Sequence, residues 1–428
     1  MQNRTDAWYT ATIGDATDYP ALTEDCRADV AVIGGGLSGV ATAVELAERG
    51  FSVVLLEANR IGWGASGRNG GQVTGSLSGD KAMLKQLRPT MGAAAEDYVW
   101  NLRWRGHQII ERRIERYAIQ CDLKRGHLHA AWKPSHMPEL EATYSEACQR
   151  GMEHEVELLD ESAVKDYVGT DLYHGALYNS RNLHLHSLNL CLGEARAATG
   201  LGARIFEGSR VESIQHGATP IVETAQGRVT ADSVILTGNA YHRLERKKLG
   251  GLLFPAVLAN LTTKPLSAEV ATAINPKDLA VYDTRFVLDY YRLTSDNRLM
   301  FGGGANYSGR NLEDVAGLLR PAIEKTFPQL KGISIDYEWT GQAGITINRI
   351  PQIGRLSNNV YYAQGYSGHG IATSHILAEV LAETIAGSLE EFDRLAALKP
   401  IRIPLGDRVG QSLLTLGMHY YQTLERFR

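Results

Sequence analysis

The chain has 428 residues, of which 44 are Lys or Arg and 48 are Asp or Glu, giving a formal net charge of -4. This balance argues against a polyanionic partner, so we expect no nucleic-acid binding. The length exceeds one ordinary hydrophobic core and predicts two domains, or one nucleotide-binding domain carrying a large insertion.

The N-terminal segment, residues 1–19, is polar and lacks the basic and apolar regions of a signal peptide. No stretch approaches the ~20 apolar residues of a membrane-spanning helix. We therefore expect a cytoplasmic protein without an integral membrane segment. The cysteines are far apart and form no C-x-x-C motif, so reduced thiols are expected.

A β-α-β unit is predicted near the N-terminus. Residues 28–33 form a β-branched run that ends in glycines, residues 38–48 have helical spacing, and residues 51–56 are a second apolar strand. A glycine-rich loop follows at 62–79.

The rest of the chain alternates between helices and strands. Predicted helices cover 89–117, 139–151, 189–199, 310–327 and 370–387. Predicted strands cover 203–206, 210–215, 221–224, 227–230, 233–237 and 360–363, and residues 285–291 and 298–302 form a hairpin. An amphipathic stretch at 412–428 is expected to pack against its own chain.

The β-α-β unit carries a dinucleotide fingerprint. Gly34, Gly36 and Gly39 satisfy G-x-G-x-x-G, a pattern that allows a tight turn, close approach of the main chain to a diphosphate, and close helix–strand packing. The helix N-terminus that follows favours the diphosphate charge. Glu57, at the end of the second strand, is expected to accept a hydrogen bond from a ribose hydroxyl.

A second motif follows in residues 62–72, which read G-W-G-A-S-G-R-N-G-G-Q. Its small residues let main-chain amides approach a planar ring and a diphosphate. Ser66 suits a phosphate, and Arg68 and Gln72 are placed to reach a ring or a substrate.

This second motif resembles the second flavin motif of the D-amino-acid oxidase superfamily, and residues 339–355 and 364–373 extend the likeness over nearly the whole chain. The resemblance implies an α/β fold: a Rossmann-type FAD-binding domain with an interleaved α+β substrate domain built on an antiparallel sheet, as in glycine oxidase. It also implies noncovalent FAD, because no cysteine in these motifs is placed for attachment.

The resemblance further implies domain boundaries and FAD contacts. The FAD-binding domain is expected to be discontinuous, over 26–95, 189–245 and 341–400, with a substrate domain over 96–188 and 246–340, an N-terminal extension over 1–25 and a helical tail over 401–428. The expected FAD contacts are Gly34, Gly36, Leu37, Ser38, Gly39, Glu57, Ala58, Arg60, Ala65, Ser66, Gly70, Gly71, Gln72, Val211, Gly238, Gly344, Gly368, His369, Gly370 and Ile371.

Only one dinucleotide fingerprint is present in the sequence. A flavoenzyme reduced by NAD(P)H usually has a second nucleotide site, so the substrate itself is expected to reduce the flavin. The loop at 365–371 leads into a helix whose N-terminus would stabilise negative charge on the reduced ring. His369 either adds to this effect or donates to a backbone carbonyl.

The resemblance also implies an amine substrate, which must be neutral to lose a hydride. Deprotonating an alkylamine near neutral pH costs on the order of 4 kcal/mol, and an apolar aromatic pocket lowers that cost. The aromatic candidates are Trp63, Phe286, Tyr290, Tyr291 and Trp339. Tyr290 shares a strand face with Arg292; these tyrosines either line the pocket or pack the sheet.

Charged candidates on the substrate side depend on the amine. Arg292 or Arg285 would clamp a carboxylate, whereas a free polyamine would need acids such as Asp283, Asp289 or Glu338. The residues predicted to act in catalysis are Tyr290, Arg292, His369, Trp63 and Trp339. His184 and His186 have no carboxylate motif nearby and are interpreted as structural, with no metal expected.

The function implied by the resemblance is an FAD-dependent amine oxidase. It would convert a gamma-glutamyl amine such as gamma-glutamylputrescine to an aldehyde, ammonia and hydrogen peroxide, with dioxygen as electron acceptor. The alternatives are an oxidase of another amine or amino acid of the glycine, sarcosine or D-amino-acid type, a dehydrogenase passing electrons to a quinone or carrier, and a protein in which FAD only supports folding.

Overall fold

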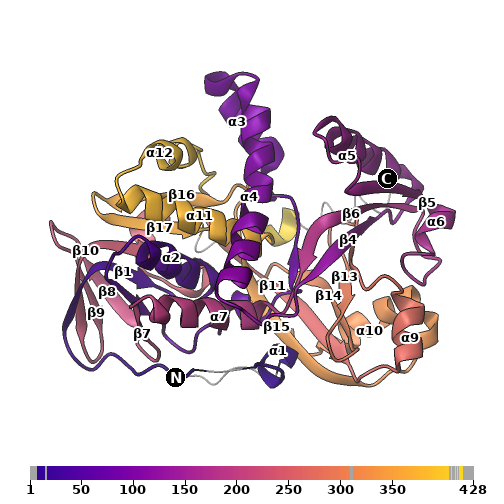
Figure 1. Cartoon of the computed structure of the whole chain (residues 1–428), viewed down its shortest axis with the longest axis horizontal. Coiled ribbons are helices and arrows are strands. Elements are labelled where there is room, and N and C mark those ends of the chain that lie inside the picture. The colour runs from indigo at the N-terminus through magenta and orange to yellow at the C-terminus, as the bar shows by residue number, and fades with distance from the viewer. Residues whose placement is uncertain are drawn as a thin grey trace.

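The predicted β-α-β unit forms the centre of a first, mixed sheet (Figure 1). The computed structural model describes residues 7–14, 17–308, 312–403, 406, 410, 412 and 414–417. Within them the sheet comprises β1 (Cys26–Ile33), β2 (Val53–Leu56), β7 (Arg204–Phe206), β8 (Val211–Gln215), β9 (Ile221–Thr224), β10 (Arg228–Leu236), β16 (Gln352–Ser357) and β17 (Val360–Gln364). The order is β16–β17–β10–β1–β2–β7, with β9 beside β10 and β8 beside β9. The strands β17, β10, β1, β2 and β7 run parallel.

A second sheet lies beside the first. Its strands are β3 (Gln72–Val73), β4 (Lys124–Ala130), β5 (Val156–Asp160), β6 (Gly175–His184), β11 (Phe254–Thr263), β12 (Ala280–Asp283), β13 (Tyr290–Leu293), β14 (Leu299–Asn306) and β15 (Ile335–Ile345). The order is β15–β11–β14–β13–β12–β4–β6–β3, with β5 on β6. Every neighbouring pair is antiparallel except β12 and β4, which run parallel. The α/β prediction is confirmed, and the predicted antiparallel sheet holds with that one exception.

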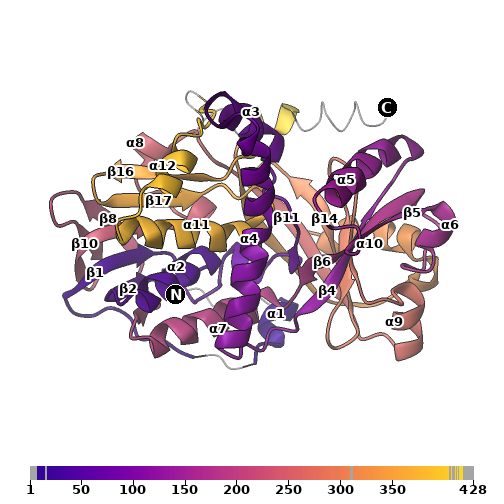
Figure 2. The same cartoon turned by 45° about the horizontal axis from the view of Figure 1, so that its top comes forward.

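Helices cover both sheets (Figure 2). Helices α2, α4, α7 and α11 pack on one another, α10 packs on β11, β14 and β15, and α5 and α6 pack on β5 and β6. The helices are α1 (Trp8–Ala11), α2 (Leu37–Glu48), α3 (Asp80–Met91), α4 (Ala94–Arg116), α5 (Met137–Gln149), α6 (Glu161–Val164), α7 (Ser187–Gly200), α8 (Arg246–Leu249), α9 (Ala268–Ile274), α10 (Val315–Thr326), α11 (Gly370–Ile385) and α12 (Glu390–Ala396). No helix in these described residues is long and apolar enough to cross a membrane.

The centre of the first sheet is buried on both faces. Val30 and Val32 of β1 belong to the core shared with α2, α7 and α11, whereas Ala31 and Ile33 belong to the core under β8 and β9. This division follows the period of two in a strand, and burial on both faces explains the unbroken apolar run.

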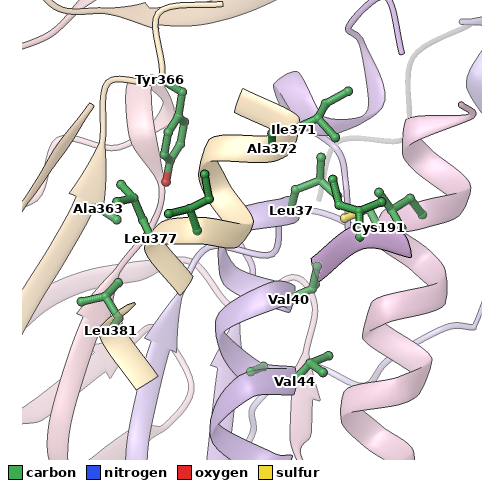
Figure 3. Packing of buried hydrophobic residues seen from close by; sticks show 14 of the residues in the cluster. Leu37, Val40, Val44, Cys191, Ala363, Tyr366, Ile371, Ala372, Leu377 and Leu381 are labelled. Carbon is green, nitrogen blue, oxygen red and sulfur yellow. The ribbon is translucent and has the colours of Figure 1, made fainter. Parts of the chain in front are cut away.

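Helices α2 and α11 begin at the same edge of this sheet, because each follows the carboxyl end of a parallel strand. Leu37 and Val40 of α2 lie among the buried residues that include Ile371 and Leu377 of α11 (Figure 3). The hydroxyl groups of Ser38 and Tyr366 are 2.6 Å apart and link the two helix starts. The packing therefore aims both helix N-termini at one place.

Several predicted elements differ from the structure; the helix predicted at 310–327, for example, begins at Val315. The helix predicted at 89–117 is two helices, α3 and α4, separated at Gly92, whose φ of +59° ends the first. The strands predicted at 227–230 and 233–237 are one strand, β10. The first strand of the predicted hairpin begins late, at Tyr290, because Arg285 pairs with both Asp283 and Asp289 and closes residues 284–289 into a loop.

The predicted domain boundaries stay a prediction. Helix α4, predicted within the substrate domain, packs on α3 and on α11. Of the predicted helical tail, only 401–403, 406, 410, 412 and 414–417 fall within the described residues, and the rest of 401–428 lies outside them.

A buried ionic cluster joins the four packed helices. The guanidinium of Arg113 on α4 donates to Glu194 on α7 and to Glu45 on α2, each at 2.6 Å. His375 on α11 lies 2.9 Å from the same Glu194 oxygen, and these side chains are at most 2% exposed. Burial alone would raise the pKa of Glu194, but His375 and Arg113 hold it below its usual value.

We expect Arg113→Met to lower the free energy of unfolding by about 3–5 kcal/mol, because it removes the buried guanidinium that two carboxylates share and leaves Glu45 with Arg49 and Glu194 with His375. Arg116→Gln on the same helix is the control, since Arg116 is 57% exposed and its surface pair is worth about 1 kcal/mol or less. Urea unfolding with excess FAD measures both. Equal effects of the two substitutions would show that the cluster does not stabilise the helix packing.

Candidate active site

A cavity of about 1580 Å³ lies where the two sheets meet. One wall is the edge of the first sheet at which α2 and α11 begin, and another is a face of the second sheet. Loop 62–72 runs along the same cavity. The dinucleotide fingerprint and loop 62–72 are far from loop 365–371 in the sequence. All three therefore come together only in the folded chain, around this cavity.

The fingerprint glycines present bare main chain to this cavity. Gly34 has a φ of +112°, and a Cβ at Gly39 would lie 1.8 Å from the carbonyl oxygen of Gly34. A Cβ at Gly36 would lie 2.8 Å from the hydroxyl of Ser66, which itself accepts a 2.9 Å hydrogen bond from the Leu37 amide. Side chains at these positions would fill the space at the start of α2, so the glycines keep it open for an anionic ligand.

Glu57 lies on the cavity wall beside this turn. Its carboxylate accepts hydrogen bonds from the amides of Gly35 and Asn59, each at 2.7 Å. Burial raises the pKa of Glu57 while those two amides lower it. Each oxygen retains a second lone pair, so the predicted ribose contact stays possible and remains a prediction.

Arg60, one of the predicted FAD contacts, lies away from the cavity. Its guanidinium is 2.6 Å from Glu207 and 2.5 Å from Asp18. Glu207 is fully buried and needs a counter-ion, which explains why Arg60 turns toward it.

Loop 62–72 is held by its own polar side chains. Asn69 donates to the carbonyls of Ala65 and Ser66 and accepts from the Gly71 amide. Arg68 stacks over the Trp63 ring at 4.4 Å, and its Nη2 is buried without a hydrogen-bond partner in the described part of the chain. Burial lowers the pKa of Arg68. The loop is thus cross-linked by hydrogen bonds and carries a cation for which the described residues supply no carboxylate partner.

The start of α11 forms the opposite wall. Gly368, His369 and Gly370 line the cavity, and the Nδ1 of His369 is buried with no hydrogen-bond partner among the described residues. Burial lowers the pKa of His369, which favours the neutral ring. A helix N-terminus at this place stabilises negative charge in a ligand.

Most other predicted FAD contacts reach the same cavity, although their contact with FAD stays a prediction. Those on its wall are Gly34, Gly36, Leu37, Ser38, Glu57, Ala58, Ala65, Ser66, Gly70, Gly71, Gln72, Val211, Gly238, Gly344, Gly368, His369, Gly370 and Ile371. Gly39 lies behind the wall, where it allows the close packing described above. The Gln72 amide is already engaged, because it donates to the carbonyls of Val281 and Tyr291.

A row of cross-strand neighbours on the second sheet lines the other part of the cavity. Tyr290 on β13 pairs with Tyr282 on β12, which pairs with His129 on β4, which pairs with Leu177 on β6. The Tyr290 hydroxyl donates to Asn260 at 2.9 Å. Its ring crosses Gly302, where a Cβ would lie 2.2 Å from the ring. Register and one glycine together orient this tyrosine.

The row is uncharged at neutral pH. Burial lowers the pKa of His129 to about 4 and that of His127, its neighbour on the same face of β4, to about 3. His129 stacks on Tyr282 with ring centroids 4.3 Å apart. His127 donates from Nε2 to the Leu183 carbonyl, which leaves Nδ1 as a buried acceptor without a partner in the described structure. This wall favours a neutral amine over an ammonium only through desolvation, since it carries no compensating acid.

Two residues predicted to act in catalysis, Arg292 and Trp339, do not line the cavity. Arg292 is 2% exposed, and its guanidinium donates hydrogen bonds to the carbonyls of Gly70, Leu293 and Leu185. It is therefore not available to bind a carboxylate. Trp339 is also buried and donates to the Arg68 carbonyl.

The remaining candidates lie on the wall. Trp63, Tyr290 and His369 line the cavity, and their roles stay predictions. Arg285 also lines it but is paired with Asp283 and Asp289, which leaves those acids unsuited to a polyamine.

Sequence reasoning missed His127, His129, Tyr282 and Asn260. The run 124–130, K-R-G-H-L-H-A, alternates and places both histidines on one face, a signal that was available. Asn260 gave no signal, because only the register across Gly302 brings it to Tyr290. In the described residues no group of three or more His, Cys, Asp or Glu side chains is placed to hold a metal ion.

Residues 29–384 match the DAO family of FAD dependent oxidoreductases. The chain belongs to this family: it is an FAD-dependent oxidoreductase acting on CH–NH or CH–NH2 groups. The bare glycine turn, the two helix N-termini and the partnerless Arg68 donor fit the diphosphate and ring of that cofactor.

Two full-length relatives stand out. The chain is 41% identical over 428 residues to gamma-glutamylputrescine oxidoreductase of Escherichia coli, covering 100% of this chain and 99% of the relative. It is 37% identical over 424 residues to the probable oxidoreductase OrdL of Haemophilus influenzae, covering 96% and 95%.

Solved structures show the same fold. Glycine oxidase from Geobacillus kaustophilus aligns with a TM-score of 0.70 at 21% identity, over 86% of this chain and 98% of that one. L-proline dehydrogenase from P. horikoshii aligns with a TM-score of 0.70 at 21% identity, over 84% and 94%. The predicted family and fold are confirmed.

We expect Gly39→Ala to weaken FAD binding by about 10-fold or more, because the new Cβ must displace the Gly34 main chain. Titration of the apoprotein with FAD, followed by flavin fluorescence, measures this. Gly200→Ala is the matched control, since its Cβ would meet open space. Wild-type affinity in the Gly39 variant would mean that close packing at this turn does not shape the FAD site.

We expect the free energy of unfolding to fall on acidification, beginning at pH values well above those at which ordinary carboxylates titrate. Burial lowers the pKa of His107, His129 and His242 to about 4 and that of His127 and His186 to about 3. In the unfolded chain these groups titrate near ~6.5. Between pH 6.5 and 4 the unfolded state binds more protons, so the free energy of unfolding falls as pH falls. Each histidine removes about 2 kcal/mol by pH 5.

Urea unfolding at pH 7, 6 and 5 tests this dependence. Asp289, whose pKa burial raises to about 6, opposes the histidines, as do Glu57, Asp283 and Glu383, whose pKa burial also raises. His127→Gln is expected to flatten the dependence, whereas His154→Gln, at an exposed side chain, leaves it unchanged. A free energy of unfolding that is constant from pH 7 to 5 would contradict the prediction.

Proposed function

We propose that this protein oxidises a gamma-glutamyl amine, such as gamma-glutamylputrescine, to an aldehyde, ammonia and hydrogen peroxide, with dioxygen as electron acceptor. The observation that carries the proposal is the 41% identity over the full length to a gamma-glutamylputrescine oxidoreductase. The uncharged aromatic wall of the cavity supports an amine substrate.

The chain's residues divide the work. FAD, when bound, supplies a two-electron acceptor. Gly34, Gly36 and Ser66 would hold its diphosphate, and the starts of α2 and α11 would offset its negative charge. Tyr290, Tyr282 and His129 form the wall on which the amine lies.

The uncharged wall affects the protonation state of the substrate amine. The amine enters as an ammonium and must lose a proton, which costs on the order of 4 kcal/mol near pH 7 in water. Enclosure by uncharged aromatic side chains lowers the ammonium pKa by desolvation. Loss of a hydride from the carbon, for which FAD would be the acceptor, and of a proton from the nitrogen converts the neutral amine to an imine, and water converts the imine to the aldehyde and ammonia.

The test is an anaerobic screen of amines that follows the oxidised-flavin absorbance band. We expect gamma-glutamylputrescine to bleach the flavin faster than putrescine, glycine, sarcosine or D-alanine. In air, one dioxygen should be consumed and one hydrogen peroxide formed per ammonia released. Bleaching by glycine or sarcosine alone would contradict the substrate, and bleaching without oxygen uptake would contradict the acceptor.

A further inference from the structure

The cavity extends beyond the residues predicted to contact FAD. We call this extension the α4–α5 chamber and define it by Lys81, Trp100, Arg103, Trp104, Thr143 and Glu146. Helices α3 and α4 form one side and α5 faces them (Figure 2). Leu177 of β6, the last member of the aromatic row, also lines the cavity and packs with Trp104. The chamber is thus continuous with the wall proposed for the amine.

Arg103 is the central cation of the chamber. Its side chain is 15% exposed, with Nε 3.4 Å from Asp80 and Nη1 3.3 Å from Glu146. Charge-assisted hydrogen bonds are normally ~2.7–2.9 Å, so both contacts are long. The Nε is buried and has no hydrogen-bond partner within the described residues. Asp80 is already engaged at the start of α3, where it accepts from Ser76 and Leu77. Arg103 therefore retains donors for an anion.

Glu146 supplies the opposite charge from the facing helix. It is 44% exposed and its contact with Arg103 spans the chamber from α5 to α4. The Trp100 ring lies beside Arg103, with the guanidinium 5.4 Å from the ring centroid. Lys81 and Glu139 make a second long contact between the same two sides, at 3.5 Å. A cation and an anion on opposite walls match a zwitterion better than a free ammonium, which Arg103 and Lys81 repel.

The dimensions agree with an extended substrate. Adjacent strands are ~4.8 Å apart, so the three steps from Tyr290 to Leu177 span about 14 Å. In gamma-glutamylputrescine about eight bonds separate the reacting carbon from the glutamyl α-carbon, which is roughly 9 Å when extended, and the α-carboxylate reaches further. The two steps from Tyr282 to Leu177 span about 10 Å, so a reacting carbon held near Tyr282 would place the α-amino-acid group near Leu177 and the chamber.

We propose that Arg103 and Glu146 bind the α-amino-acid end of the gamma-glutamyl group. Arg103 takes the α-carboxylate and Glu146 takes the α-ammonium, and the aromatic row accommodates the amide and the alkyl chain between this end and the reacting amine. The inference rests on the proposed function, which it deepens by assigning substrate specificity to a site remote from the flavin.

Three substrates of equal chain length test it. Gamma-glutamylputrescine carries both charges, N-glutarylputrescine lacks the α-amine, and N-(4-aminobutyryl)putrescine lacks the α-carboxylate. Arg103→Gln is expected to raise KM about 10-fold or more for the two carboxylate-bearing substrates and to leave the third within about twofold. Glu146→Gln is expected to raise KM by a similar factor for gamma-glutamylputrescine and N-(4-aminobutyryl)putrescine, which carry an amine at the acyl end. It should leave the KM of N-glutarylputrescine unchanged. The rate of anaerobic flavin reduction, measured at increasing concentrations of each substrate, gives the affinity for that substrate independently of kcat.

The pair Arg88 and Glu96, whose side chains are 60% and 34% exposed, provides matched controls, because its members are 2.7 Å apart near the junction of α3 and α4 and do not line the cavity. Arg88→Gln and Glu96→Gln should change none of the three affinities. Loss of all three substrates alike in Arg103→Gln, or no loss in either chamber variant, would overturn the chamber assignment while leaving the amine oxidation intact. Failure of gamma-glutamylputrescine to reduce the wild-type flavin would overturn the proposed function, and the assignment with it.

Discussion

A guanidinium with almost no access to water underlies this architecture. Arg113 pairs with carboxylates from two other helices, and His375 of a fourth helix shares one of them. In a medium of low dielectric, sliding one helix past another would strand a charge. The helices are therefore held in one register, which fixes α2 and α11 relative to one another at the sheet edge where their parallel strands end. The cofactor site is a consequence of this alignment.

The cavity is electrostatically divided. At the FAD end, helix N-termini, bare amides and the partnerless Arg68 donor favour negative charge. At the proposed amine end, His127 and His129 stay neutral because burial lowers their pKa. A reaction that moves electrons from an amine to a flavin transfers charge from the second region to the first. The desolvation that keeps the histidines neutral also disfavours an ammonium. One physical effect therefore favours the neutral form of both the wall and the amine.

Strand periodicity predicted which side chains share a face of a strand, but not which of them reach the cavity. It placed Tyr290 and Arg292 on one face, but only Tyr290 lines the cavity. Arg292 lies under Gly70 and Leu185, whose carbonyls bind its donors. Alternation says which residues share a face, whereas the neighbours covering that face decide which are accessible. The missed His129 illustrates the converse, because its importance depends on stacking against Tyr282 from another part of the chain.

The amino-acid sequence by itself determined the dinucleotide turn, the central β-α-β unit and the family. These were readable because the turn uses contiguous main chain, and local glycine spacing is enough to specify it. Tertiary structure alone brought together the residues of the proposed substrate side. Tyr290, His129, Arg103 and Glu146 come from four separate elements, and their proximity depends on strand order and helix packing. Side-chain sites assembled across such distances leave no local pattern, since no short segment contains more than one or two of their members.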